Sequence, residues 1–245
     1  MRIVIVGGAA GAIAGRSAAD RPVPGGFIVG VLGLRAAATG WNERRARAAG
    51  RRLRIIRTHP GDHAGHCPGA EQMNLGLVVD ADTDDVLGAQ GVGPAGVDKR
   101  IDVIAAVMAG GPRAAELGRL EPACAPQSSS AKDPVNMLGL VDENLRDGPT
   151  ENLQWHEPDA AAGAAVLDVR SPVEHARAGH PRLAAHPAGR AARPAGRAAR
   201  RGARRVLRGY SACRILARHG RRARSLDGGL ATWSSGTAAA RASGQ

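Results

Sequence analysis

The sequence predicts an α/β chain in three unequal parts, 1–29, 30–150 and 151–245. Three observations lead to this prediction. A β-branched run near the N-terminus is followed at once by glycines, as in a strand that leads through a turn into a helix. Large apolar residues are concentrated before Glu151, where they can offset the entropy cost of folding. Arginine is concentrated in the last part, which has fewer residues able to build a core.

The first part begins with Ile3–Val6, a run typical of a strand that is buried on both faces. The turn and helix start that follow could hold a pyrophosphate on free backbone N–H groups. The candidate cofactor-binding residues are Gly7, Gly8, Ala9, Gly11 and Ala12. The alternative is a turn without ligand, because the Ala9 methyl would crowd a phosphate and no ribose-binding acid follows about twenty residues later.

The middle part is predicted to fold as strands and helices in alternation. Strands are expected at Leu53–Thr58, Met73–Asp80 and Val86–Gln90, and helices at Val97–Ala109 and Val135–Leu145. Asp133 is expected to cap the last helix, with Pro134 in its first position. Capping explains this segment, although Lys132 could instead reach an anion.

Two motifs in the middle part are candidate ligand-binding sites. Gly91–Gly96 has the GxGxxG spacing, but Pro94 removes a backbone donor, so we interpret it as a glycine-rich turn. His59, His63, His66 and Cys67 could ligate zinc, or could belong to a polar loop. No second ligand pair lies at zinc-finger spacing, so we expect no metal.

The last part is predicted to contain a strand near Ala165–Val169 and a helix near Tyr210–His219. The formal net charge of +12 arises here, because residues 175–226 hold fifteen arginines and no acid. Within it, 184–208 is nearly all Ala, Arg, Gly and Pro. This tract is either a basic arm that binds nucleic acid or a stretch that has lost its ancestral sequence. Incidental binding to RNA or DNA is expected in either case.

The cysteines indicate the compartment. Cys67, Cys124 and Cys213 lie far apart, and an odd, sparse set favours a reducing environment, so we expect a cytoplasmic protein. No apolar run approaches the 18 residues of a membrane span. The N-terminus could also pass for a signal peptide, but its glycines favour a strand and turn.

Several segments resemble one enzyme family. Residues 30–147 are similar to the dimerisation domain of flavin-dependent pyridine nucleotide-disulfide oxidoreductases, in the coenzyme A-disulfide reductase branch. Residues 1–15 resemble the first FAD-binding strand and turn of that family, and 151–245 resemble a rhodanese domain. The segments that carry the resemblance are Thr39–Glu43, His63–Ala70, Leu87–Gln90, Gly96–Val103, Ala131–Asn136, Leu167–His175, Ala178–Pro181, Leu207–Leu216 and Leu226–Trp233.

The resemblance implies FAD- and NAD(P)H-dependent disulfide reduction, in which a hydride passes from nicotinamide to FAD and then to a cysteine–coenzyme A disulfide. It implies a homodimer through 30–150. Only Arg16–Gly30 stand where the family has the rest of the FAD site, the NAD(P)H site and the redox cysteine, so we expect an internally truncated chain without activity. The alternatives are a non-catalytic dimerisation module and a basic nucleic-acid binder through 184–208.

Other positions also depart from the family. The tyrosines that this branch uses near the partner's active site are replaced by His66-Cys67 and Cys124-Ala125-Pro126. In the rhodanese loop Cys-x-x-Gly-x-Arg, aligned on Arg208, the cysteine position holds Ala203 and the glycine position Val206. Cys213 lies in the following helix, where we interpret it as a small buried hydrophobe rather than a nucleophile.

Overall fold

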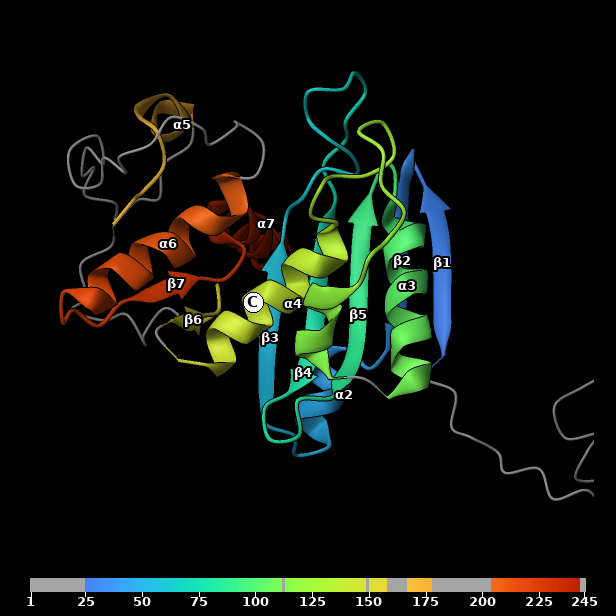
Figure 1. Ribbon diagram of the computed structural model, residues 1–245, viewed down its shortest axis with the longest axis horizontal. Helices are drawn as coiled ribbons and strands as arrows, with labels where there is room; N and C mark the ends of the chain where they lie inside the picture. Colours follow the sequence, from blue (N-terminus) through green and yellow to red (C-terminus); the bar gives the residue numbers. More distant parts are fainter. Residues whose placement is uncertain (1–24, 112, 149, 158–166, 178–203, 243–245) are drawn as a thin grey trace, which may run out of the picture.

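A computed structural model of the chain describes residues 25–111, 113–148, 150–157, 167–177 and 204–242. Its centre is a five-stranded antiparallel sheet in the order β1-β2-β5-β4-β3 (Figure 1). The strands are β1 (Gly26–Val31), β2 (Leu34–Gly40), β3 (Leu53–Thr58), β4 (Asn74–Asp80) and β5 (Val86–Gly93). β1 and β3 are therefore the two edges of the sheet.

Local residues set the turns between the strands. Leu32 and Gly33 both have positive φ, 51° and 78°, as a two-residue hairpin turn between β1 and β2 requires. The short helix α2 (Glu43–Ala48) follows β2 and is capped by the side chain of Asn42. Asp80 Oδ1 accepts the N–H groups of Asp82 and Thr83 and closes the turn before β5.

Helices cover one face of the sheet. α3 (Val97–Gly110) packs on β2 and β5, and α4 (Pro134–Arg146) packs on β3 and on the 3₁₀ helix η1 (Ala114–Arg119). The main core lies between them; its most buried members are Ile56, Met73, Leu77, Val79, Ala89, Val97, Ile104, Leu117, Val135, Leu138 and Val141. The capping of α4 by Asp133, with Pro134 in the first turn, is confirmed.

The opposite face is only partly covered. Near β3, Ala46 of α2 packs on Ile55 and Val78. Over β1, β2 and β5 the strand registers place a row of apolar side chains on this face, and all of them are exposed. We call this row the open face; it consists of Phe27, Val29, Val31, Leu34 and Val92.

The C-terminal region lies beside β3 (Figure 1). It contains a two-stranded parallel sheet, β6 (Glu151–Leu153) and β7 (Arg224–Leu226). Its helices are α5 (Pro172–Arg177), α6 (Arg204–Arg218) and α7 (Gly229–Ala242). Tyr210 of α6 is buried and joins the main core, which ties this region to the first sheet.

The strands and helices predicted for the middle part are confirmed, and their ends shift by no more than three residues. The hairpin β1–β2 was not predicted, and the expected boundary between residues 29 and 30 falls inside β1. The helix predicted at Tyr210–His219 is confirmed within α6. Residues 165 and 166 of the predicted strand lie outside the described residues; Leu167 forms a single bridge, and Asp168 and Val169 are not in a strand.

The interpretation of Gly91–Gly96 as a turn is wrong for its first half. β5 continues to Gly93, and the turn begins only at Pro94. A Cβ on Gly91 would lie 2.7 Å from a methyl of Val97, and one on Gly93 would lie 2.8 Å from Met73. Gly91 and Gly93 have no side chain because α3 and Met73 approach β5 closely at these positions.

Candidate functional site

Two loops meet at one end of the sheet, residues 59–73 and residues 121–133. Their backbones are joined by a hydrogen bond of 3.0 Å from the Ala64 N–H to the Pro126 carbonyl, and Figure 1 shows them side by side beyond the strand ends. These loops contain His66-Cys67 and Cys124-Ala125-Pro126. We call them the loop pair.

A buried arginine holds the loop pair together. Arg100 of α3 is 1% exposed. Its Nη2 donates to the Asp62 carbonyl (2.8 Å) in the first loop, and to Asp133 Oδ2 (3.0 Å) and Ser129 Oγ (3.4 Å) in the second. Its Nη1 donates to the Gly96 carbonyl at 3.2 Å. One buried charge that is paired and hydrogen-bonded thus fixes both loops relative to α3.

The histidines of the first loop point to different partners. His63 Nδ1 lies 3.0 Å from Asp62 Oδ2, and hydrogen bonding to that carboxylate raises the pKa of His63. His59 lies within hydrogen-bond distance of Asn74 and, at 2.7 Å, of Thr232 Oγ1. Within the described ranges, no three His, Cys, Asp or Glu side chains gather as a metal site would require.

The thiols of the loop pair are accessible to different degrees. Cys67 is partly exposed and Cys124 is exposed, with its Sγ 3.4 Å from the Ser130 carbonyl. Cys213 lies elsewhere, on α6, at 5% exposure, and burial raises the pKa of its thiol. The interpretation of Cys213 as a small buried hydrophobe is confirmed.

A second polar cluster closes the β3 edge of the sheet. Asp227, directly after β7, is fully buried, and its Oδ1 accepts the backbone N–H of Arg57 and the amide of Asn152, both at 3.0 Å. Its Oδ2 accepts from Gln154 Nε2 at 3.2 Å and from Arg57 Nη1 at 3.4 Å. Gln154 Nε2 also lies 3.3 Å from the Ile55 carbonyl.

These contacts satisfy backbone groups that an edge strand otherwise leaves free. In β3 the register directs the N–H of Arg57 and the carbonyl of Ile55 away from β4, and side chains of the C-terminal region bind both. Burial raises the pKa of Asp227 to about 6 despite its ion pair with Arg57. We call this set of contacts the β3 seam.

The C-terminal region carries a separate charged cluster. Arg208 donates to both carboxylate oxygens of Glu174, at 2.7 and 2.9 Å, and lowers the pKa of Glu174 to about 2. Asp168 accepts from Arg170 at 2.6 Å and from His175 at 2.9 Å, and the Arg170 contact lowers its pKa most. Ala203, the residue aligned with the family's cysteine, lies outside the described residues, as does most of the tract 184–208.

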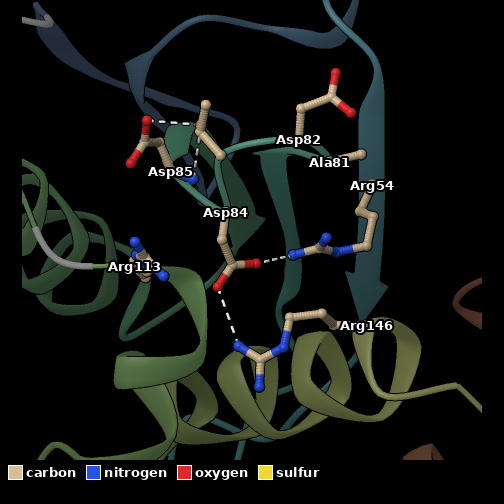
Figure 2. A pocket seen from close by; sticks show the side chains of 8 residues that line it. Arg54, Ala81, Asp82, Asp84, Asp85, Arg113 and Arg146 are labelled. Carbon is tan, nitrogen blue, oxygen red and sulfur yellow. Dashed lines mark hydrogen bonds and ion pairs between the residues drawn. The ribbon is translucent and has the colours of Figure 1, made fainter.

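An open pocket of about 710 Å³ lies beside the β4–β5 turn. Figure 2 shows Asp84 between Arg54 and Arg146, contacting both. Three arginines and three aspartates line the pocket, with Asp84 in a left-handed conformation at φ 70°. The balanced charge selects neither anions nor cations. These ion pairs join the turn to α4, through Arg146 and through Asp142, which accepts from Arg54 at 2.9 Å.

The predicted cofactor-binding residues Gly7, Gly8, Ala9, Gly11 and Ala12 lie outside the described residues. Gly91–Gly96 opens a helix within the described part, and side chains of α3, β4 and Met73 lie close to Gly91 and Gly93. This pattern therefore offers no open cradle for a phosphate of FAD, and no described residue is assigned FAD chemistry.

Comparison with known proteins finds a family model that fits this sheet. Residues 28–133 match the model of the pyridine nucleotide-disulphide oxidoreductase dimerisation domain. This part of the chain is therefore similar to that domain. FAD is the cofactor of the family to which such domains belong.

Curated relatives agree with this assignment. The coenzyme A disulfide reductase of Staphylococcus haemolyticus is 40% identical over 91 residues, which are 37% of this chain and 21% of the relative. That of Staphylococcus aureus strain RF122 is 37% identical over 86 residues, or 35% of this chain and 20% of the relative. The matched segment thus spans about a fifth of these relatives.

Two solved structures are similar over more of the chain. Reduced Bacillus anthracis CoADR-RHD has a TM-score of 0.75 and 30% identity, and covers 86% of this chain and 39% of its own. A NAD-dependent persulfide reductase from A. fulgidus has a TM-score of 0.74 and 30% identity, with 91% and 41% covered. Both matches therefore extend beyond the dimerisation domain.

The sequence marks His66-Cys67 and Cys124-Ala125-Pro126 as separate stretches and does not predict their contact, and the β3 seam was not predicted at all. Asp227 is followed by Gly228 and Gly229, which both have a φ of 63°. This Asp-Gly-Gly directly after a short strand was a signal for a fixed carboxylate at a turn. Its partners Arg57 and Gln154 lie far away in the sequence, so no local pattern could identify them.

No helix of the described segments is long and apolar enough to cross a membrane.

Proposed function

We propose that this chain acts as a non-catalytic dimerisation module related to FAD- and NAD(P)H-dependent reductases of coenzyme A disulfides or persulfides. It pairs with a second copy through residues 30–150 and carries a rhodanese-like region at 151–245. The match of residues 28–133 to a dimerisation domain and the two structural matches support this proposal. The observation that carries it is the loop pair, which Arg100 holds in one arrangement although the side chains on it have changed.

The described residues do not supply an electron path of their own. Their larger sheet is wholly antiparallel, whereas a dinucleotide site of the predicted kind is built on parallel strands. Of the three thiols, Cys213 is buried, and Cys67 and Cys124 lie on loops rather than at the start of a helix that could hold a flavin. We therefore infer that hydride transfer needs parts that the described residues do not form.

The decisive experiment combines cofactor binding with turnover. The purified full chain is incubated with FAD, desalted and examined for flavin absorbance, and then assayed for NADPH oxidation with coenzyme A disulfide. We expect no retained flavin and no turnover, together with a dimeric mass by light scattering. Retained flavin with NADPH-driven release of thiols would overturn the non-catalytic assignment. A monomeric mass would overturn the dimerisation module.

We also propose that the rhodanese-like region does not transfer sulfur. The arginine aligned with the family's loop is neutralised by Glu174, and the buried Cys213 has a raised pKa, which opposes thiolate formation. We expect no thiocyanate from thiosulfate and cyanide, and reaction of Cys213 with a thiol reagent only after unfolding. Transfer activity that is lost in Cys213→Ser and kept in Cys124→Ser would contradict this.

A further inference from the structure

Among the residues that the structure describes, none covers the β1 edge of the sheet as the C-terminal region covers the β3 edge. β1 reads Gly-Phe-Ile-Val-Gly-Val, with neither a charge nor a proline, and its side chains remain exposed: Phe27 at 64%, Ile28 at 54% and Val29 at 48%. Leu32 at the tip of the hairpin is 98% exposed. Natural edge strands are normally blunted by charges, proline or a cover, because a free edge pairs with other chains.

The register shows which backbone groups are free. The Gly40 N–H donates to the Gly25 carbonyl at 3.0 Å, and hydrogen-bonded pairs alternate along an antiparallel ladder. Gly26, Ile28 and Gly30 therefore direct their N–H and carbonyl groups away from β2. Phe27 and Val29 lie between them, with their side chains on the open face.

We propose that β1 pairs antiparallel with β1 of a second copy, joining the two sheets into one of ten strands. The proposal rests on the dimerisation proposed above and specifies its interface. A two-fold axis at Ile28 gives each of the three outward-facing residues an outward-facing partner: Ile28 pairs with Ile28 of the second copy, and Gly26 pairs with Gly30. Shifting the axis by one residue leaves one of the three without a partner inside the strand.

The side chains favour a second copy as the occupant. In this register Phe27 lies opposite Val29 of the other copy on the open face, an aromatic and β-branched pair of the kind that stabilises antiparallel sheets. The edge carries no charge that could select a charged partner, while an identical uncharged strand is self-complementary. Arg35, the charge next to this hairpin, is already paired with Asp98 at 3.5 Å.

Disulfide trapping tests the register directly. Phe27 and Val29 of opposite copies form a non-hydrogen-bonded pair, whose Cα atoms lie about 4.5 Å apart, within the range that a disulfide spans. We expect the full chain with Phe27→Cys and Val29→Cys to form a covalent dimer under mild oxidation with copper phenanthroline. The disulfide should join position 27 of one copy to position 29 of the other. The matched control, Phe27→Cys with Val31→Cys, places two thiols on the same face without partners and should remain uncross-linked beyond the parent chain.

The oligomeric state distinguishes the two proposals. In the parent chain we expect a dimer by analytical ultracentrifugation, and in Val29→Lys a monomer with unchanged circular dichroism; Ile215→Lys, an exposed apolar residue on α6, should remain dimeric. A monomeric parent would overturn both the dimerisation module and this interface. A parent dimer that persists in Val29→Lys, without specific 27–29 cross-linking, would overturn this interface and leave the dimerisation module standing.

Discussion

The two edge strands of the larger sheet, β3 and β1, differ in whether side chains bind their outward-facing backbone groups. At β3, the carboxylate of Asp227 and the amide of Gln154 bind the outward-facing backbone, and two arginines break the apolar pattern of the strand. At β1, the strand is uncharged and exposed. An edge can thus be closed by side chains of its own chain or left available for another chain.

Removing the carboxylate of the β3 seam should have the largest effect. Asp227→Ala leaves the Arg57 guanidinium, its N–H and the amides of Asn152 and Gln154 without their shared acceptor. We expect a loss of about 3 kcal/mol in the free energy of unfolding, the low end of the range for removing one partner of a buried ion pair, because Arg57 keeps its ion pair with Glu43. Urea unfolding measures it. Asp98→Ala, which removes an exposed pair, is the matched control and should cost less than about 1 kcal/mol; equal losses would contradict the role of the seam.

Gln154 should contribute less than Asp227 to the stability of the fold, because its side-chain amide carries no charge. Gln154→Ala removes donors to the Ile55 carbonyl and to Asp227, and an acceptor for Arg57. We expect a loss of about 1–3 kcal/mol, the cost of unsatisfied buried polar groups. Urea unfolding measures the loss. Hydrogen exchange of the Arg57 amide should change little, because Asp227 remains its acceptor. A loss as large as that of Asp227→Ala would contradict this order.

The seam should also respond to pH. The pKa of Asp227 is about 6 in the folded chain and 3.8 as its ordinary value, so the folded state binds a proton more tightly. The resulting stabilisation is fully present below pH 3.8 and is lost as pH rises through 6. The free energy of unfolding of the parent, relative to that of Asp227→Asn, should therefore fall between pH 4 and pH 7. Parallel profiles of the two chains would refute this.

A charge on the β1 edge should barely change the stability of one copy. Val29 is half exposed, so Val29→Lys should alter the free energy of unfolding by no more than about 0.5 kcal/mol at concentrations where the parent is monomeric. Thermal unfolding followed by circular dichroism at high dilution checks this. A large loss there would mean that Val29 supports the fold of the single copy, and the contrast between the two edges would fail.

The sequence predicted the segments whose pattern is local. Asp133-Pro134 capped α4 as expected, and the apolar runs of β3, β4 and α3 fixed those elements, because capping and periodicity act within a few residues. The hairpin β1–β2 was not predicted because its turn, Leu32-Gly33, lacks the Asn-Gly or Asp-Gly pair that marks a two-residue hairpin turn in sequence. Gly91 and Gly93 were misread because their purpose depends on Val97 and Met73 packing against them.

The candidate sites follow the same division. His66-Cys67 and Cys124 were singled out because sequence motifs mark them, but the hydrogen bond between Ala64 and Pro126 that joins their loops was not predicted. The links of Arg100 to Asp62 and Asp133, and of Asp227 to Arg57, join residues between 33 and 170 positions apart. No propensity or spacing within one segment encodes such pairs; they emerge when the sheet, α3 and the C-terminal region pack together.

Hydrogen exchange of the full chain as a function of its concentration tests the contrast between the edges most directly. The amide of Arg57 in β3 should be protected equally at every concentration, because its acceptor belongs to the same chain. The amides of Gly26, Ile28 and Gly30 should exchange quickly when dilute and become protected as the dimer forms. Rapid exchange of those three amides in a fully formed dimer, or concentration-dependent protection of Arg57, would contradict the account.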